Sequence, residues 1–269
     1  MRAFNGPGPK NLAGHLAAWH RTGDFHACPR SGAPGWPAVT VGTVSLADAW
    51  ERNATDWIAW ARAPDHDGFW DGTWPALLEI LPDSAGLTVD LGCGEGRASR
   101  LLLAAGRQVL GIERSPTLAR AAAIGPPALP VAQADAARLP LADGCAGLVV
   151  ASMSLLDIDD FAGAIAETAR ILRPGGALCF AIVHPFDSAC DSGAPGGVPG
   201  VVSQPYLASR RYEDRFERGG LGITLVSMHR PLSAYTTALF RAGLVITDLH
   251  ERGEREVPWL LAVRAEKPS

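Results

Sequence analysis

Three glycines and one acid, placed between two apolar runs, are the residues of this chain best suited to hold a ligand. The stretch "VDLGCGEG" supplies Gly92, Gly94 and Gly96, and the next apolar run, "QVLGIE", ends in Glu113. A glycine-rich turn before a helix lets the backbone approach a ligand closely and points free N–H groups at it. An acid about 20 positions later, at the end of the next strand, can accept both hydrogen bonds of a ribose diol. We therefore expect an adenosine-bearing ligand.

Two other nucleotide-binding glycine motifs match this turn poorly. The dinucleotide fingerprint requires a third glycine where this chain has Arg97, or Ser99 when the motif is read from Gly94. A P-loop requires Gly-Lys-Ser or Gly-Lys-Thr after the turn, and the chain has neither there. The turn thus disfavours NAD and P-loop nucleotides.

Apolar runs alternate with helical segments around this turn. The apolar runs are "GLTVDL", "QVLGIE", "ALPVAQAD", "CAGLVVAS" and "GALCFAIVH", and the helical segments are "GRASRLLLAAG", "SPTLARAAAI" and "DDFAGAIAETARIL". Strands this uniformly apolar have no wet face, which indicates a mostly parallel sheet covered by helices on both sides. The fold class predicted is α/β and doubly wound.

The segments on either side of this core differ in character. Residues 1–44 are rich in Gly, Pro, His and Trp and predict an irregular arm, whereas "SLADAWERNATDWIAWARA" and "WPALLEILP" predict two N-terminal helices. After the fifth apolar run, 185–222 reads as a long irregular insertion interrupted by Gly and Pro. Then "GITLVSMHRP" predicts a strand, "LSAYTTALFRAG" a helix, and "LVITDLHE" and "WLLAVRAE" two final strands.

Composition limits the partners and the cell compartment. The chain has 269 residues, 47% of them hydrophobic, and a formal net charge of -4 without a long basic run. It can bury a substantial core, and its charge favours a small-molecule partner over nucleic acid. Five cysteines without C-x-x-C spacing fit the reduced thiols of a cytoplasmic protein. We expect no membrane association and no signal peptide; the oligomeric state is open, a homodimer included.

Five motifs in order carry a resemblance to a known family. "VDLGCGEG", "VLGIERSP", "AQADAARLPLADG", "LVVASMSLLDIDD" and "ILRPGGALCFAIVHP" resemble the successive motifs of class I S-adenosylmethionine-dependent methyltransferases, in the branch with a small-molecule methyltransferase domain. The likeness covers roughly Leu46 to Glu266. It implies a Rossmann-like sheet of seven strands with an antiparallel last strand. It also implies a methyltransferase domain at 45–269, in which 185–230 is an insertion that serves as an acceptor lid.

The resemblance assigns S-adenosyl-L-methionine as cofactor and gives each motif residue a role. Asp90 and the turn from Gly92 through Cys93 to Gly94 match the positions that meet the methionine part of the cofactor. Glu113 matches the ribose-binding acid, and Arg114 matches the neighbour that packs on the adenine.

Four further residues complete the expected cofactor set. Asp135 and Ala136 match the pair that reads the adenine edge, and Ser152 matches a position lining the methionine end. Trp57 lies on a helix that closes over the cofactor in related enzymes. Two structural alternatives stand beside these roles: Asp135 as a helix cap, and the tryptophans of that helix as core packing.

The chemistry expected is methyl transfer to a small molecule, with a hydroxyl acceptor expected first and nitrogen or carbon acceptors left open. His184, at the end of the fifth apolar run, would serve as general base, with a residue that shapes the turn before Pro185 as its alternative. Tyr206 and His229 are the candidate substrate contacts. No carboxylate set suits a hard cation, so we expect no metal.

Two functions of other classes remain open. A nucleic-acid methyltransferase would be expected to show a basic face and, for amino-group targets, an Asn-Pro-Pro-aromatic motif where this chain has "ASMSLLD". A non-catalytic protein that binds the cofactor or a nucleotide on the same fold is the second alternative, because fold does not determine function.

Overall fold

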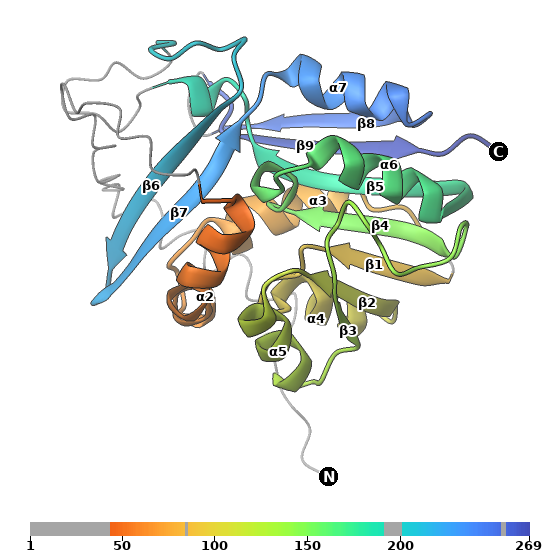
Figure 1. The fold of residues 1–269 in the computed structure, drawn as a ribbon, viewed down its shortest axis with the longest axis horizontal. Helices are drawn as coiled ribbons and strands as arrows, with labels where there is room; N and C mark the ends of the chain where they lie inside the picture. The colour runs from red at the N-terminus through yellow and green to blue at the C-terminus, as the bar shows by residue number, and fades with distance from the viewer. Residues whose placement is uncertain (1–43, 84–85, 191–200, 254–256) are drawn as a thin grey trace.

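The computed structural model describes residues 44–83, 86–190, 201–253 and 257–269. The expected arm at 1–44 therefore lies almost entirely outside the described residues. Within the described ranges, seven strands form one sheet in the order β3-β2-β1-β4-β5-β9-β8 (Figure 1). The strands are β1 Leu87–Leu91, β2 Gln108–Glu113, β3 Val131–Gln133, β4 Ala146–Ser152, β5 Leu172–Val183, β8 Val245–Arg252 and β9 Leu260–Glu266.

The direction of the strands confirms the predicted fold class. β1 pairs in parallel with β2 and β4, whereas β9 runs antiparallel to both β5 and β8. The last strand in the chain is thus inserted antiparallel between two others, as the resemblance implied. The sheet is doubly wound and mostly parallel.

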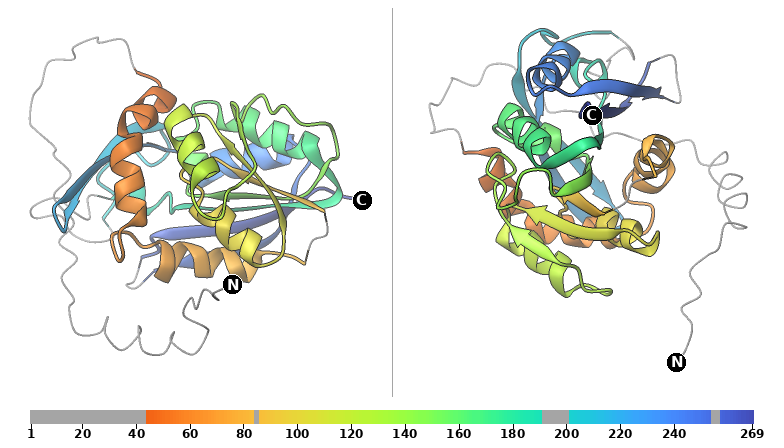
Figure 2. Two further views of the ribbon diagram at one scale, coloured as in Figure 1. Left: turned by 90° about the horizontal axis from the view of Figure 1, so that it is seen from below. Right: turned by 90° about the vertical axis from the view of Figure 1, so that its right-hand side faces the viewer.

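Helices cover both faces of this sheet, which explains why its central strands are uniformly apolar (Figure 2). On one face, α6 and α7 pack on side chains such as Val149 of β4. On the other face, α3 and α4 pack on the alternate side chains of the same strand, such as Leu148. The helices are α2 Leu46–Arg62, α3 Trp74–Ile80, α4 Arg97–Ala104, α5 Pro116–Ile124, α6 Phe161–Ile171 and α7 Leu232–Arg241, with shorter turns η2 Phe69–Thr73, η3 Leu155–Asp157 and η4 Asp187–Ala189.

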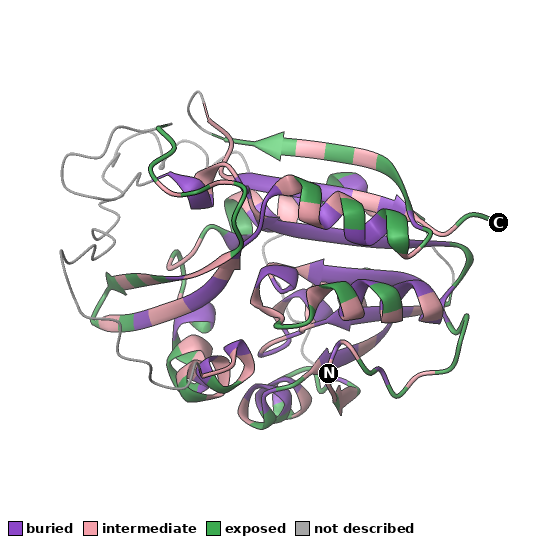
Figure 3. Ribbon diagram, turned by 45° about the horizontal axis from the view of Figure 1, so that its top comes forward, coloured by how far each residue is buried: buried purple, intermediate pink, exposed green. Residues whose placement is uncertain are grey.

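The edge strand β8 differs from the central strands. Its residues are mostly exposed, whereas β4 and β9 are almost wholly buried (Figure 3). An antiparallel edge strand can keep one face in water, so its sequence is less uniformly apolar.

The first predicted helix, α2, lies across the carboxyl ends of the sheet strands (Figure 1). It begins at Ser45, whose side chain accepts the N–H of Asp48 at 3.0 Å as an N-cap. Asn53 of α2 donates to the β7 carbonyl of Thr224 at 2.6 Å. On its other side, Glu51 accepts the hydroxyl of Thr117 at the start of α5 at 2.6 Å. These contacts hold α2 above the edge where the strands end.

The insertion after β5 is more regular than its sequence predicts. β6 (Arg210–Arg218) and β7 (Leu221–His229) form an antiparallel hairpin outside the main sheet. The strand expected from "GITLVSMHRP" is confirmed as β7, but the prediction of irregular chain as far as Gly222 is wrong over β6. Charged side chains dominate "RRYEDRFER", because every residue of this strand except Tyr212 is exposed or only partly buried.

Candidate active site

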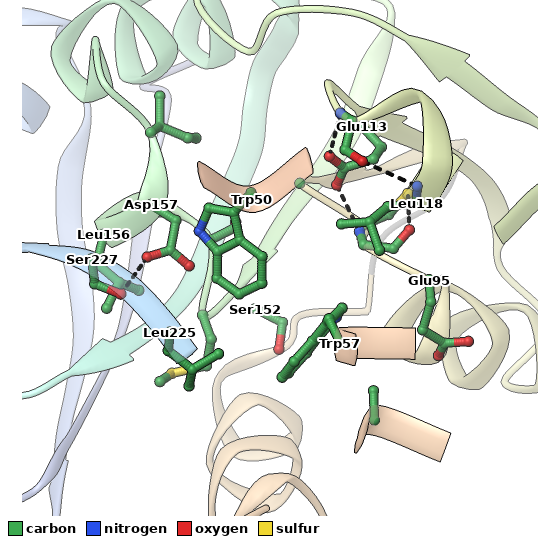
Figure 4. A pocket seen from close by; sticks show the side chains of 18 of the residues that line it. Trp50, Trp57, Glu95, Glu113, Leu118, Ser152, Leu156, Asp157, Leu225 and Ser227 are labelled. Carbon is green, nitrogen blue, oxygen red and sulfur yellow. Dashed lines mark hydrogen bonds between the residues drawn. The ribbon is translucent and has the colours of Figure 1, made fainter. Parts of the chain in front are cut away.

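A cavity of about 510 Å³ opens at the carboxyl ends of β1, β2 and β4. Its size lies within the range of roughly 300–1,000 Å³ that small-molecule sites occupy. The glycine turn and the strand ends form one side, and α2 with the β6–β7 hairpin forms the other (Figure 4). Ligands of open α/β sheets bind at this edge.

The structure brings all ten residues predicted to meet the cofactor to this one cavity. They are Trp57, Asp90, Gly92, Cys93, Gly94, Glu113, Arg114, Asp135, Ala136 and Ser152. They come from α2 and from the ends of four neighbouring strands, so the motif order in the sequence translates into one continuous wall. Their contacts with a ligand remain predictions.

The glycine turn has a backbone that other residues rarely adopt. Gly92, Gly94 and Gly96 have φ values of +72°, +58° and +92°. A Cβ at Gly92 would lie 2.6 Å from Cβ of Ser154, closer than two carbon atoms can approach. The turn therefore needs glycine both for its backbone conformation and for the close packing of the segment after β4.

Glu113 faces the glycine turn from the end of β2. Its Oε2 accepts the N–H of Gly94 at 2.9 Å, and its Oε1 accepts the N–H of Ser115 at 2.8 Å. Burial raises the pKa of this carboxyl, and the backbone N–H donors oppose that rise. The carboxylate is fixed at the cavity wall by backbone groups, with acceptor capacity left for a ligand.

Asp90 is buried beneath the turn at the end of β1. Its Oδ2 accepts the hydroxyl of Ser99 at 2.5 Å, but its Oδ1 has no hydrogen-bond partner. Burial raises its pKa to about 6, which the Ser99 hydroxyl opposes. A buried carboxylate oxygen without a partner is costly, so a cationic group in the cavity would stabilise it.

Arg114 and Asp135 form a more open part of the wall. Arg114 Nη1 lies 3.1 Å from Asp135 Oδ2, and both side chains are substantially exposed. Asp135 also accepts the N–H of Ala137 at 3.0 Å, within a turn that no helix follows. The alternative of Asp135 as a helix cap is therefore wrong, although the residue does fix a turn.

The tryptophans of α2 divide between the cavity and the core. Trp50 and Trp57 both line the cavity and meet edge to face, with ring centroids 5.6 Å apart. Trp60 is 4% exposed, stacks edge-on against His66 and also borders the cavity. The tryptophans of this helix thus both pack in the core and line the cavity.

His184 lies outside the residues that line the cavity, so its expected role as general base needs correction. Its Nε2 lies 2.9 Å from Glu251 Oε1 on β8, and its Nδ1 accepts the N–H of Phe186 at 3.0 Å. In the sheet, β9 and then β8 lie beside β5, so the contact with Glu251 turns the His184 ring toward the β8 edge of the sheet. The structure supports the alternative in which His184 shapes a turn.

The two predicted substrate contacts, Tyr206 and His229, are also absent from the cavity wall. His229 is 1% exposed and hydrogen-bonded through both ring nitrogens, to the Ser188 hydroxyl at 2.7 Å and to the carbonyl of Tyr206 at 2.8 Å. The hydroxyl of Tyr206 accepts the N–H of Leu232 at 3.3 Å. These residues tie the insertion to α7 rather than facing a substrate.

Sequence reasoning missed several side chains on the other side of the cavity. The wall opposite the glycine turn consists of Trp50, Asp157, Leu225 and Ser227, and we name it the acceptor-side wall for the role proposed below (Figure 4). It joins α2, the turn after β4 and the β7 strand, so no single stretch of sequence contains it. The acids of "SLLDIDD" were the available sequence signal for this wall. Because Asp157, Asp159 and Asp160 have the same side chain, the sequence did not show which of them would have this position.

The described residues contain neither a cluster of metal-ligating side chains nor a helix that could span a membrane. No group of three or more His, Cys, Asp or Glu side chains within them could hold a metal ion, and the absence of a metal remains a prediction. None of the helices in these ranges has the length and apolarity that a membrane span requires.

Comparison with known proteins places residues 89–180 in a methyltransferase domain family. Malonyl-[acyl-carrier protein] O-methyltransferase of Pectobacterium atrosepticum is 36% identical over 106 residues, which are 39% of this chain and 42% of that protein. The chain thus aligns with less than half the length of this curated relative.

Solved structures extend the similarity to most of the described fold. An S-adenosylmethionine dependent methyltransferase from Mesorhizobium loti is 29% identical with a TM-score of 0.56, covering 73% of this chain and 99% of the other. The glycopeptide N-methyltransferase MtfA, solved with S-adenosylhomocysteine, shares the fold at 20% identity with a TM-score of 0.54, covering 73% and 87%. Residues 89–180 therefore form a methyltransferase domain, the fold around it is that of S-adenosylmethionine-dependent methyltransferases, and the cofactor is S-adenosylmethionine.

Proposed function

We propose that this protein transfers the methyl group of S-adenosylmethionine to a small-molecule acceptor. One observation supports the proposal: a single cavity is lined by all ten predicted cofactor residues and also by a wall of other side chains, the acceptor-side wall. Both partners of a transfer reaction can therefore meet within it. Malonyl-[acyl-carrier protein] O-methylation is the activity in the name of a relative that this chain matches over 42% of that protein's length.

The residues present fit this cofactor. The unpartnered Oδ1 of Asp90 suits the cationic amino group of the methionine part, and Glu113 can accept hydrogen bonds from the ribose diol. Gly92 and Gly94 let the backbone come close, and we propose that the adenine binds beside Asp135 and Ala136, which line the cavity. When bound, S-adenosylmethionine supplies a methyl group activated by its positively charged sulfur. The protein's part is then to align the acceptor and to exclude water.

We further propose a cytoplasmic enzyme without a nucleic-acid partner. The net charge of -4 offers no general attraction for phosphates, and a cavity of about 510 Å³ suits a small acceptor better than a polymer. A homodimer also remains a proposal, which light scattering of the purified protein would test.

Methyl transfer itself is tested with labelled cofactor. The protein is incubated with methyl-labelled S-adenosylmethionine and a metabolite extract, and the labelled product is identified. We expect label in a low-molecular-weight compound. Binding of cofactor without any labelled product would support a non-catalytic cofactor-binding protein. Label in nucleic acid would support a nucleic-acid methyltransferase.

The affinity for S-adenosylmethionine should fall as the pH is lowered through the pKa of Asp90. Burial raises this pKa to about 6 and raises that of Glu113 as well, and both groups must be ionised to hold the cofactor. A cationic ligand binds the ionised form of Asp90. The affinity for S-adenosylmethionine is therefore highest above that pKa and declines by up to roughly tenfold per pH unit below it.

Calorimetric titrations on both sides of that pKa measure this effect. Repeating them in buffers of different ionisation enthalpy should show protons released on binding near the pKa. An affinity that stays constant across this range would show that neither carboxyl meets the cofactor.

A further inference from the structure

The acceptor-side wall contains a carboxyl group that the cofactor does not explain. Asp157 ends the η3 turn after β4 and lines the cavity, and Figure 4 places it across from Glu113 beside Trp50, Leu225 and Ser227. Its Oδ1 accepts the hydroxyl of Ser227 on β7 at 2.6 Å. A strand end and the inserted hairpin thus jointly position this carboxyl.

Three acids stand close together in this segment, and they have different tasks. Asp159 accepts the N–H of Leu46 at 3.0 Å, where α2 begins, and Asp160 accepts the N–H of Gly163 at 2.9 Å as the N-cap of α6. Both of these acids have a structural role at a helix start. All three acids border the cavity, but the carboxyl of Asp157 is held by Ser227 of the hairpin and caps no helix.

Arg230 fixes the backbone on both sides of Asp157. Its guanidinium, which is 4% exposed, donates to the carbonyls of Leu155, Leu156 and Ile158 at 3.2, 3.3 and 2.6 Å. Among the ion pairs of the described residues, none joins Arg230 to Asp157. The arginine therefore positions the turn without using up the carboxyl.

The charges around the cavity disfavour an anionic acceptor. Arg97 forms an ion pair with Asp67 at 2.8 Å and lies over the ring of Phe69, and Arg114 forms one with Asp135. Both arginines that line the cavity are therefore already paired with carboxylates. A carboxylate placed beside the ionised form of Asp157 would meet a like charge, and the nearby guanidinium of Arg230 already donates to three backbone carbonyls.

We propose that Asp157 binds the reacting group of the methyl acceptor and accepts its proton, so that the acceptor is a hydroxyl or amine compound with an apolar body rather than a carboxylate. This inference rests on the proposed function and specifies its substrate class. Trp50, Leu156 and Leu225 supply the apolar surface for that body.

Methyl transfer moves one methyl group to the acceptor and one proton to Asp157. The lone pair of the acceptor's oxygen or nitrogen forms the bond to the methyl carbon, and the carbon–sulfur bond breaks with its electron pair going to sulfur. The proton leaves the O–H or N–H group for the carboxylate of Asp157, which later releases it to water. Burial raises the pKa of Asp157 to about 8, opposed by the Ser227 hydroxyl and Arg230, and a base that titrates near neutral pH is efficient.

Other titratable groups around Asp157 must be considered in a pH profile. Arg230 lies at the end of β7, Glu113 at the end of β2 and Tyr235 on α7, and each interacts electrostatically with Asp157. Of these, Glu113 belongs to the cofactor side, so its titration changes cofactor affinity. The titration of Asp157 should change turnover instead.

Binding of two small probes tests the charge preference while S-adenosylhomocysteine fills the cofactor side of the cavity. Benzylamine and benzoate have the same aromatic body and opposite charge, and calorimetry or NMR measures their affinity for the unmodified protein and for Asp157→Asn. We expect the unmodified protein to prefer benzylamine by about tenfold or more, and the variant to lose that preference. Equal affinity for both probes, or a preference that survives in the variant, would overturn the proposal.

Turnover supplies the second readout. Asp157→Asn should slow label transfer by roughly 10²- to 10⁴-fold with cofactor affinity unchanged, and should remove the ionisation near pH 8 from the pH profile. Ser227→Ala should give a smaller loss, and Asp143→Asn, at an exposed acid outside the cavity, is the matched control with normal turnover.

Turnover of Asp157→Asn within about threefold of the parent contradicts the role of Asp157 as a base. If the unmodified protein itself forms no labelled product, the proposed function fails, whereas the probe experiment still decides whether Asp157 selects acceptor charge.

Discussion

Replacement of Gly92 by alanine should destabilise the protein and weaken S-adenosylmethionine binding together. An alanine at φ +72° costs about 1–2 kcal/mol in backbone strain. Its Cβ would also lie 2.6 Å from Cβ of the buried Ser154, and such overpacking costs roughly 1–3 kcal/mol more. Relief of that contact must move the glycine turn or the segment after β4. Because both border the cavity, we expect cofactor affinity to fall by about tenfold or more.

Gly106→Ala provides the matched control for this experiment. Gly106 has φ +81°, and a Cβ there would meet no atom within 4 Å. The control shares the backbone strain without the contact, so it should lower the free energy of unfolding by about 1–2 kcal/mol and leave cofactor affinity unchanged. Denaturant unfolding and calorimetry measure the two effects. Normal affinity in Gly92→Ala would mean that the turn does not hold the cofactor.

Replacement of Glu113 by alanine should weaken S-adenosylmethionine binding by tenfold or more while the fold is retained. Hydrogen bonds to a charged carboxylate contribute about 1.5–3 kcal/mol each, and a ribose diol can donate two. The same side chain also accepts the N–H groups of Gly94 and Ser115, so its loss loosens the turn as well.

Glu79→Ala separates a specific effect from a general loss of charge. Glu79 is an exposed acid on α3 that pairs with Arg252 and His250 away from the cavity, so its removal should leave cofactor affinity unchanged. If Glu113→Ala bound the cofactor as tightly as Glu79→Ala does, the assignment of Glu113 to the ribose would be wrong.

The cofactor side could be predicted well from sequence because local motifs determine it. Each of Asp90, Glu113, Asp135 and Ser152 ends a strand or follows one, and parallel neighbouring strands bring such ends to one edge. The apolar runs identified the strands, because burial on both faces leaves little room for polar residues. The positions of these residues therefore follow from the motifs and the sheet together.

The acceptor side could not be predicted because it depends on contacts between distant segments. His184 directly follows β5 at the expected edge, but its ring is hydrogen-bonded to Glu251 of β8 and does not line the cavity. Asp157 differs from Asp159 and Asp160 only in what surrounds it after folding. The hairpin strand β6 was missed because its charged residues do not show the apolar pattern of a buried strand.

A calorimetric titration with S-adenosylmethionine and with NAD tests most directly whether this cavity is a methyltransferase cofactor site. Both ligands contain adenosine, so Glu113 alone does not separate them, but the turn lacks the third glycine of the dinucleotide fingerprint. We predict that S-adenosylmethionine and S-adenosylhomocysteine bind at one site per chain and that NAD does not bind there. Binding of NAD without binding of S-adenosylmethionine would contradict the account.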